Sequence, residues 1–141
     1  NMGLSIGEIE NEIIEEFELF DNWVDKYDYL IDLGKSLPKI DDSEKTKENI
    51  IAGCQSQVWL NASKVKGSVV FTADSDAIIT KGIIAILIRV LSYQTPQNII
   101  EAKLDFIKKI GLNNQLSQKR ATGLISMIKQ MKLYALAFKT S

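Results

Sequence analysis

Cys54 is the only residue of the 141-residue chain that could readily act as a nucleophile near neutral pH. The chain contains no histidine, which excludes Ser-His-Asp and Cys-His nucleophile pairs and HExxH metal sites. A single cysteine also excludes zinc ribbons, CxxC redox pairs and an iron–sulfur cluster bound by this chain alone. Neither GxxxxGKS/T nor GxGxxG occurs, so no phosphate-binding loop is indicated. The remaining candidate chemistry is that of one thiol.

The residues around Cys54 leave two roles open. A lone cysteine between apolar segments is most often an inert, buried side chain. However, Gly53 permits loop conformations that other residues avoid, and three polar residues follow at Gln55, Ser56 and Gln57. Cys54 is therefore either a structural side chain or a reactive thiol in a turn between two strands.

Charge is unevenly distributed although the net charge is only −1. Residues 1–48 hold 14 acidic and five basic side chains, whereas residues 49–141 hold 12 basic and four acidic ones. This uneven charge distribution either guides the approach of a protein partner or simply reflects charged helix faces that contact solvent. The basic residues are not interleaved with aromatic ones, so nucleic-acid binding is not indicated.

Length and composition predict one soluble domain over residues 1–141, with 45% hydrophobic and 25% charged residues. The most apolar run, residues 82–91, contains Arg89 and is far shorter than the ~20 residues of a membrane span. No secretory signal is recognised, and Asn1 ahead of Met2 is interpreted as a cloning remnant. One free cysteine fits a reducing compartment, so the cytoplasm is the expected location.

Two amphipathic helices are predicted in the first 35 residues. Ser5 and Glu8 form a capping box at the start of the first. Asp21 or Asn22 is expected to cap the second, with Gly34 as the residue just beyond its end.

From residue 49 the pattern changes to short strands. Residues 58–64 and 68–73 are predicted to form an antiparallel hairpin through a turn containing Gly67, and Ile50-Ile51 to add a shorter third strand. The predicted fold class is α+β, with a small, about three-stranded antiparallel sheet packed against helices.

An apolar helix is predicted over residues 77–91. Asp74 or Asp76 is expected to cap it, and Gly82 to let it pack closely against the sheet.

Two further helical regions follow. Thr95-Pro96 begins a region that ends before Gly111 and breaks near Asp105, and Ser117 caps the last helix. The inward face of the last helix is expected to carry Ala121, Leu124, Ile125, Ile128 and Met131.

The stretch from Gly53 to Leu60, GCQSQVWL, resembles the active-cysteine motif of the SufE family, the sulfur acceptors of iron–sulfur cluster assembly. The resemblance extends in family order and spacing from about Trp23 to about Met131. The matching blocks are Tyr29 to Pro38, Asn49, Ala73 to Ala77, Lys81-Gly82, Thr95-Pro96, Gly111-Leu112, Leu116 to Arg120 and Gly123-Leu124. The tripeptide Gln-Ser-Gln after the cysteine is similar to the SufE branch rather than the related CsdE branch.

This resemblance implies a SufE/IscU-like fold and a role as a sulfur carrier. Its members take sulfane sulfur from a pyridoxal-phosphate cysteine desulfurase of the SufS type, stimulate that enzyme, and pass the sulfur to the SufBCD scaffold. Carried over by motif position, Cys54 would hold the persulfide. Arg120, in the block similar to the family's L-S/T-x-x-R-x-x-G, would favour the thiolate. The pyridoxal phosphate belongs to the partner, so no cofactor or metal is expected in this chain.

Other interpretations remain beside the sulfur carrier. The chain is alternatively a non-catalytic interaction module in which Cys54 is structural and Arg120 is a solvated or ion-paired arginine. An iron–sulfur scaffold similar to IscU is disfavoured, because one cysteine and no histidine cannot hold a cluster. The sequence leaves a homodimer open, and neither a membrane nor a nucleic acid is an expected partner.

Overall fold

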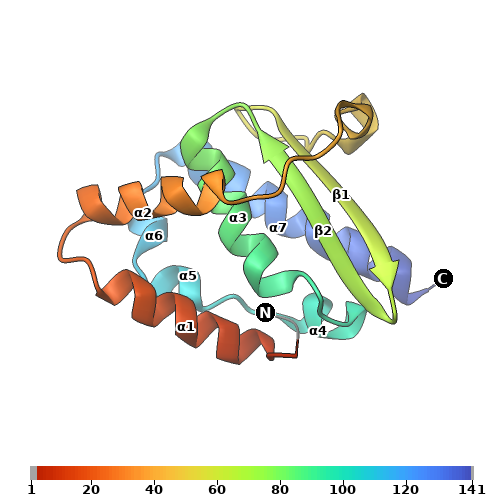
Figure 1. Ribbon diagram of the computed structural model, residues 1–141, viewed down its shortest axis with the longest axis horizontal. Coiled ribbons are helices and arrows are strands. Elements are labelled where there is room, and N and C mark those ends of the chain that lie inside the picture. Colours follow the sequence, from red (N-terminus) through yellow and green to blue (C-terminus); the bar gives the residue numbers. More distant parts are fainter. Residues whose placement is uncertain (1–2, 141) are drawn as a thin grey trace.

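The computed structural model describes residues 3–140, which form a two-stranded antiparallel sheet packed against helices (Figure 1). This architecture confirms the predicted α+β class. The elements in chain order are α1 (Ile6–Glu18), α2 (Trp23–Lys35), the 3-10 turns η1 (Asp42–Glu44) and η2 (Lys47–Asn49), β1 (Val58–Val65), β2 (Ser68–Ser75), α3 (Ile78–Leu91), α4 (Pro96–Glu101), α5 (Phe106–Lys109), α6 (Leu112–Gln115) and α7 (Gln118–Lys139).

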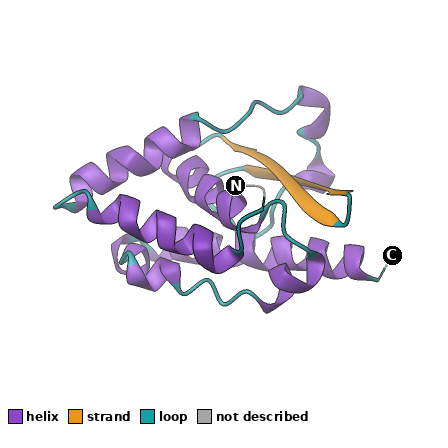
Figure 2. Ribbon diagram, turned by 60° about the horizontal axis from the view of Figure 1, so that its bottom comes forward, coloured by secondary structure: helices purple, strands orange, loops and turns teal. Residues whose placement is uncertain are grey.

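The sheet consists of the predicted hairpin. Strands β1 and β2 pair from Val58 opposite Ser75 to Val65 opposite Ser68, and Gly67 in the turn has a φ of 83°. The expectation of about three strands is corrected to two, because Ile50 makes only an isolated bridge to Trp59 before the chain turns away. Figure 2 shows the hairpin on one side of the helices.

Helix α3 is the centre of the hydrophobic core. It is apolar on most of its circumference, and nine of its 14 residues are buried. Figure 1 shows α3 between α2 and the strands, with α7 behind it. Burying a helix on nearly all sides requires packing partners around it, which these elements provide.

Two glycines allow α2 and α3 to touch through their backbones. A Cβ atom on Gly34 would lie 2.8 Å from the backbone nitrogen of Gly82, and one on Gly82 would overlap the carbonyl of Leu30. Gly34 therefore lies inside α2, which ends at Lys35, and does not follow its end as predicted. The close partner of Gly82 is α2, so the predicted packing of this glycine against the sheet is wrong.

The prediction that Asp74 or Asp76 caps α3 is wrong. The helix begins after Ala77 without a side-chain capping bond. Strand β2 continues to Ser75, which places Asp74 in the sheet, where it forms ion pairs with Lys45 and Lys81 at 2.8 and 3.1 Å.

The other predicted helix starts are confirmed. Each capping side chain accepts a hydrogen bond from a backbone N–H in the first turn of its helix. The caps are Ser5, Asn22, Thr95 and Ser117. The region after Thr95 is broken, as predicted, into α4 and α5.

Helix α7 buries a slightly different face from the predicted one. Leu124 and Met131 are buried as expected, together with Met127 and Ala135, whereas Ile125 is 66% exposed. Successive residues of a helix are rotated by about 100°, so Ile125 lies beside the buried stripe and not within it. Among the described residues, no helix has the length and apolar character needed to cross a membrane.

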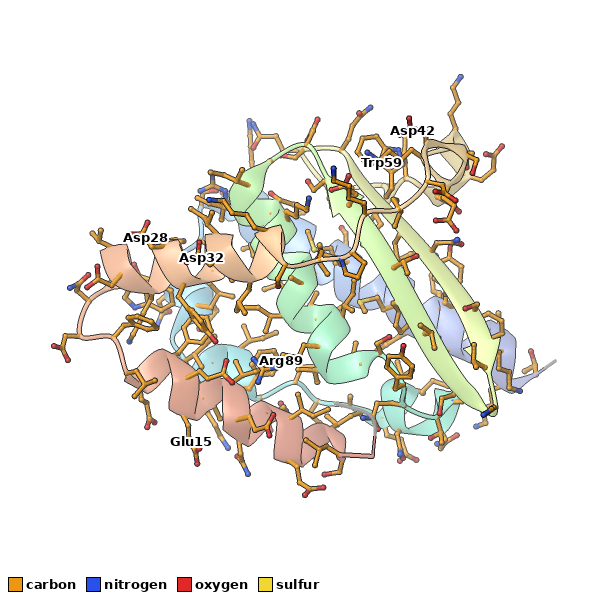
Figure 3. All side chains as sticks on the ribbon, in the orientation of Figure 1. Glu15, Asp28, Asp32, Asp42, Trp59 and Arg89 are labelled. Carbon is orange, nitrogen blue, oxygen red and sulfur yellow. The ribbon has the colours of Figure 1, made fainter. Side chains whose placement is uncertain are left out.

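The acidic residues of the N-terminal part lie mainly on the outside. Figure 3 shows Glu15 on α1 and Asp28 and Asp32 on α2 pointing away from the body of the molecule. Arg89 of α3 instead reaches Glu16 of α1, with 2.5 Å between Nη2 and Oε2. The hydrogen bond from Arg89 lowers the pKa of Glu16, although burial opposes the shift.

Candidate functional site

Cys54 lies in a loop between η2 and β1 whose two ends are anchored. At the first end, the backbone N–H of Ile51 donates to the carbonyl of Val58 at 2.9 Å. At the second, the N–H of Gln57 donates to Oδ1 of Asp76 at 3.1 Å, and the carbonyl of Gln57 accepts from Oγ of Ser75 at 2.8 Å. Strand β2 therefore fixes the point at which the loop joins β1.

The side chain of Cys54 packs on helix α7. Its Sγ donates to the carbonyl oxygen of Gly123 at 3.6 Å, a weak sulfur hydrogen bond. A Cβ atom on Gly123 would lie 3.5 Å from Sγ. This is an ordinary van der Waals distance, so the thiol lies against α7 at Gly123 without a forced close approach.

A cavity of about 200 Å³ adjoins the thiol. Both residues that the sequence suggested for the site, Cys54 and Arg120, line it. The other lining residues are Gln55, Ser56, Thr80, Ile83, Lys119, Gly123 and Met127. The lining thus combines the cysteine loop, α3 and the first turns of α7, segments that are far apart in the sequence.

Sequence reasoning missed two polar residues in the lining, Lys119 and Thr80. The position of Lys119 beside Arg120 in the sequence was the one available signal for it. Thr80 is buried in the first turn of α3 and carried no recognisable signal. Trp59, although it follows Cys54 closely in the sequence, is not part of this lining.

The electrostatic environment does not activate the thiol at rest. Cys54 is half-buried, and this burial raises the pKa of its thiol above the ordinary value. Arg120 and Lys119 are exposed at the cavity, where water screens their charges. The thiol of the isolated chain is therefore mostly protonated at neutral pH.

A second group of contacts connects the segment before the loop to the sheet. The Nζ of Lys45 lies 5.3 Å from the ring centre of Trp59, which Figure 3 shows near Asp42 on the outer side of the strands. Lys45 also pairs with Asp74. Burial alone would raise the pKa of Asp74, but the hydrogen bonds from Lys45 and Lys81 outweigh it and hold that pKa below its ordinary value.

A larger cavity of about 490 Å³ lies between α2, β2 and α3. Its lining is mainly apolar and includes Leu37, Phe71 and Tyr93, but neither Cys54 nor Arg120. The smaller cavity is the candidate site because it alone of these two contains a nucleophile.

Comparison with known proteins agrees with the cysteine motif. The family model described as SufE, Fe-S metabolism associated domain, matches residues 11–135. An uncharacterized SufE-like protein of Rhizobium meliloti (strain 1021) is 41% identical over 128 residues, which cover 86% of this chain and 91% of that protein. A second uncharacterized SufE-like protein, from Rhizobium etli, is 39% identical over 129 residues, covering 86% of each chain.

A solved structure also resembles this fold. The solution structure of a hypothetical protein from Thermus thermophilus matches with a TM-score of 0.78 and covers 94% of this chain and 97% of that one. Its sequence identity of 17% supports the fold alone. The match to the family model over most of the chain, with relatives near 40% identity, shows that the chain belongs to the SufE family of Fe-S metabolism proteins.

Proposed function

We propose that this protein is a sulfur acceptor and carrier. Cys54 takes a sulfane sulfur, as a persulfide, from a pyridoxal-phosphate cysteine desulfurase of the SufS type and passes it to the SufBCD scaffold. The observation that carries the proposal is the sole thiol of a SufE-family chain, in an anchored loop beside a cavity of about 200 Å³. The free thiol that this function needs persists in a reducing compartment, so we propose a cytoplasmic location.

The proposed transfer is a thiol exchange that balances without a cofactor of this chain. The thiolate of Cys54 attacks the terminal sulfur of the donor persulfide and forms a new S–S bond. The bond between that sulfur and the donor cysteine breaks, and the donor leaves as a thiolate. The proton of the Cys54 thiol passes to solvent or to the departing thiolate. Removing the persulfide frees the donor cysteine for another turnover, which accounts for stimulation of the desulfurase.

Activation of the thiol is proposed to require the partner. Because burial raises the pKa of Cys54, few molecules carry a thiolate when the protein is alone. A desulfurase that covers the cavity would displace water from Arg120 and Lys119, and their charges would then stabilise the thiolate more strongly. Arg120 is the proposed main contributor, since its position matches the family motif.

Intact-mass measurement tests the proposal directly. The protein is incubated with a cysteine desulfurase and cysteine, and its mass is recorded without reductant. The wild-type chain should gain the mass of one sulfur atom, and Cys54→Ser should gain none and should no longer stimulate the desulfurase. A wild-type chain that never gains sulfur, together with full stimulation by Cys54→Ser, would contradict the proposal.

The second candidate is an interaction module in which Cys54 is structural. The packing of its sulfur on Gly123 favours this role, because buried cysteines commonly serve as small apolar side chains. Under this alternative, Cys54→Ser lowers the free energy of unfolding without affecting partner stimulation. A urea titration of both chains, measured beside the stimulation assay, separates the two candidates.

A further inference from the structure

The tip of the cysteine loop rests on two small residues of α7. A Cβ atom on Gly53 would lie 2.5 Å from Oγ of Ser126 and 3.4 Å from its Cβ. One turn earlier, Gly123 lies under Cys54. Residues three apart share one face of a helix, so Gly123 and Ser126 form a continuous surface beneath the loop, here called the Gly123–Ser126 surface.

Little else holds the tip. Within the described residues 3–140, the bond from Cys54 to Gly123 is the one hydrogen bond that joins residues 52–56 to another element. Sulfur is a weak donor, whereas the loop ends at Ile51 and Gln57 are held by backbone or carboxylate bonds. Packing on α7 therefore decides where the tip lies.

The contact between Gly53 and Ser126 is close, because a single Cβ atom added at Gly53 would already meet Oγ of Ser126 at 2.5 Å. Gly53 has a φ of 88°, which other residues rarely adopt, so a larger residue at position 53 would strain the backbone as well as meet Ser126. Serine is small enough to fit beneath it. A bulkier side chain that points toward Gly53 would press on the loop, and the weakly bonded tip is the part expected to yield.

We propose that Ser126 is a positioning residue for Cys54, because the volume of the side chain at position 126 sets how much of the time the thiol lies against α7. With serine, the loop packs on the Gly123–Ser126 surface and the thiol is half-buried. With a larger residue, the tip moves outward and the thiol becomes accessible. The inference rests on the proposed function for its biological meaning, since a carrier must shield its sulfur between partners, but the positioning is a property of the isolated chain.

Alkylation of the single cysteine tests this positioning without any partner. The rate constant for reaction with iodoacetamide is measured for Ser126→Ala, Ser126→Val, Ser126→Leu and the parent. The reaction should be about tenfold faster for Ser126→Leu, intermediate for Ser126→Val, and within about twofold of the parent for Ser126→Ala. Because burial raises the thiol pKa, the pH midpoint of alkylation should also move downward for Ser126→Leu.

The matched control is Lys129→Leu, which places the same side chain on an exposed position of α7. Its alkylation rate should equal that of the parent. Thermal unfolding of every variant shows whether it is folded. If Ser126→Leu does not fold, the comparison of Ser126→Val with the parent is used as the test. Equal rates across the folded size series, or an equal acceleration by Lys129→Leu, would overturn the proposal.

The outcome is separable from the proposed function. Alkylation that follows side-chain volume at position 126 supports the positioning role even if the protein never accepts sulfur. Conversely, if sulfur transfer is normal but the alkylation rate is the same for every residue at position 126, the role of Ser126 is refuted and the proposed sulfur-carrier function stands.

Discussion

The carboxylate of Asp76 accepts a hydrogen bond from the backbone N–H of Gln57, with 3.1 Å between the two atoms. The bond is reciprocated, because the N–H of Asp76 donates to the carbonyl of Gln57 at 3.3 Å. This pair connects the end of the cysteine loop to the end of β2. It explains an aspartate at this position better than helix capping does, since α3 begins without a side-chain cap.

Loss of this carboxylate should release the end of the loop. Asp76→Ala removes the acceptor for the N–H of Gln57. We expect alkylation of Cys54 by iodoacetamide to become about two- to tenfold faster, which corresponds to the net free energy of one hydrogen bond. Asp76→Asn is the matched control, because it keeps an acceptor oxygen and should react nearly as slowly as the parent. An unchanged rate in Asp76→Ala would mean that the other bonds to Gln57 suffice.

The reactivity of Cys54 should depend on pH in a way that reports its burial. Because burial raises the thiol pKa, the midpoint of the alkylation rate against pH should lie above the ~8.5 of a free cysteine, and should return toward that value in the urea-unfolded chain. A midpoint at or below the value of the unfolded chain would contradict this assignment.

The same pKa shift has a consequence for stability. Between the unfolded and folded pKa values the folded chain binds more protons, so the free energy of unfolding should fall as pH rises through this alkaline window. Cys54→Ala removes the titrating group. Its unfolding free energy should therefore decline less than that of the parent over the same pH range, as measured by urea titrations at several pH values.

Arg120 should matter for transfer but not for the resting thiol. In Arg120→Ala, partner-dependent sulfur transfer should slow about tenfold, equivalent to ~1.4 kcal/mol, whereas alkylation of the isolated protein should change less than about twofold because Arg120 is exposed. Single-turnover transfer from a persulfidated desulfurase measures the first quantity. Lys119→Ala removes a positive charge from the neighbouring position and so controls for loss of charge in general. An equal slowing of transfer in both variants would argue against a specific role for Arg120.

Two glycine-to-alanine substitutions should have opposite effects on stability. Gly82→Ala places a Cβ on the carbonyl of Leu30 and should lower the free energy of unfolding by about 3 kcal/mol through overpacking. Gly7→Ala, in α1, meets no atom within 4 Å and should stabilise the chain by up to about 1 kcal/mol through helix propensity. Urea unfolding of the two variants gives both numbers. A tolerated Gly82→Ala would show that α2 and α3 can separate without penalty.

Features that depend on short stretches of chain were predictable from the sequence. The capping side chains of Ser5, Asn22, Thr95 and Ser117 act within one helical turn, and the hairpin depends on residues on either side of Gly67. The family blocks likewise indicated Cys54, and the absence of histidine limited its chemistry. Such features need no knowledge of distant partners, because their physical causes are local.

Only the tertiary structure decided which distant residues meet. Gly82 contacts α2 and not the sheet, and Asp76 holds the cysteine loop and not a helix. No local pattern distinguishes these outcomes. A glycine permits close packing against any element, and a carboxylate can accept a hydrogen bond from any nearby donor, so the partner depends on the tertiary fold. The sequence by itself left one thiol, that of Cys54, as the candidate for the proposed chemistry. The packing of its loop on Gly123 and Ser126 determined how that thiol is shielded, since burial depends on atoms contributed by another part of the chain.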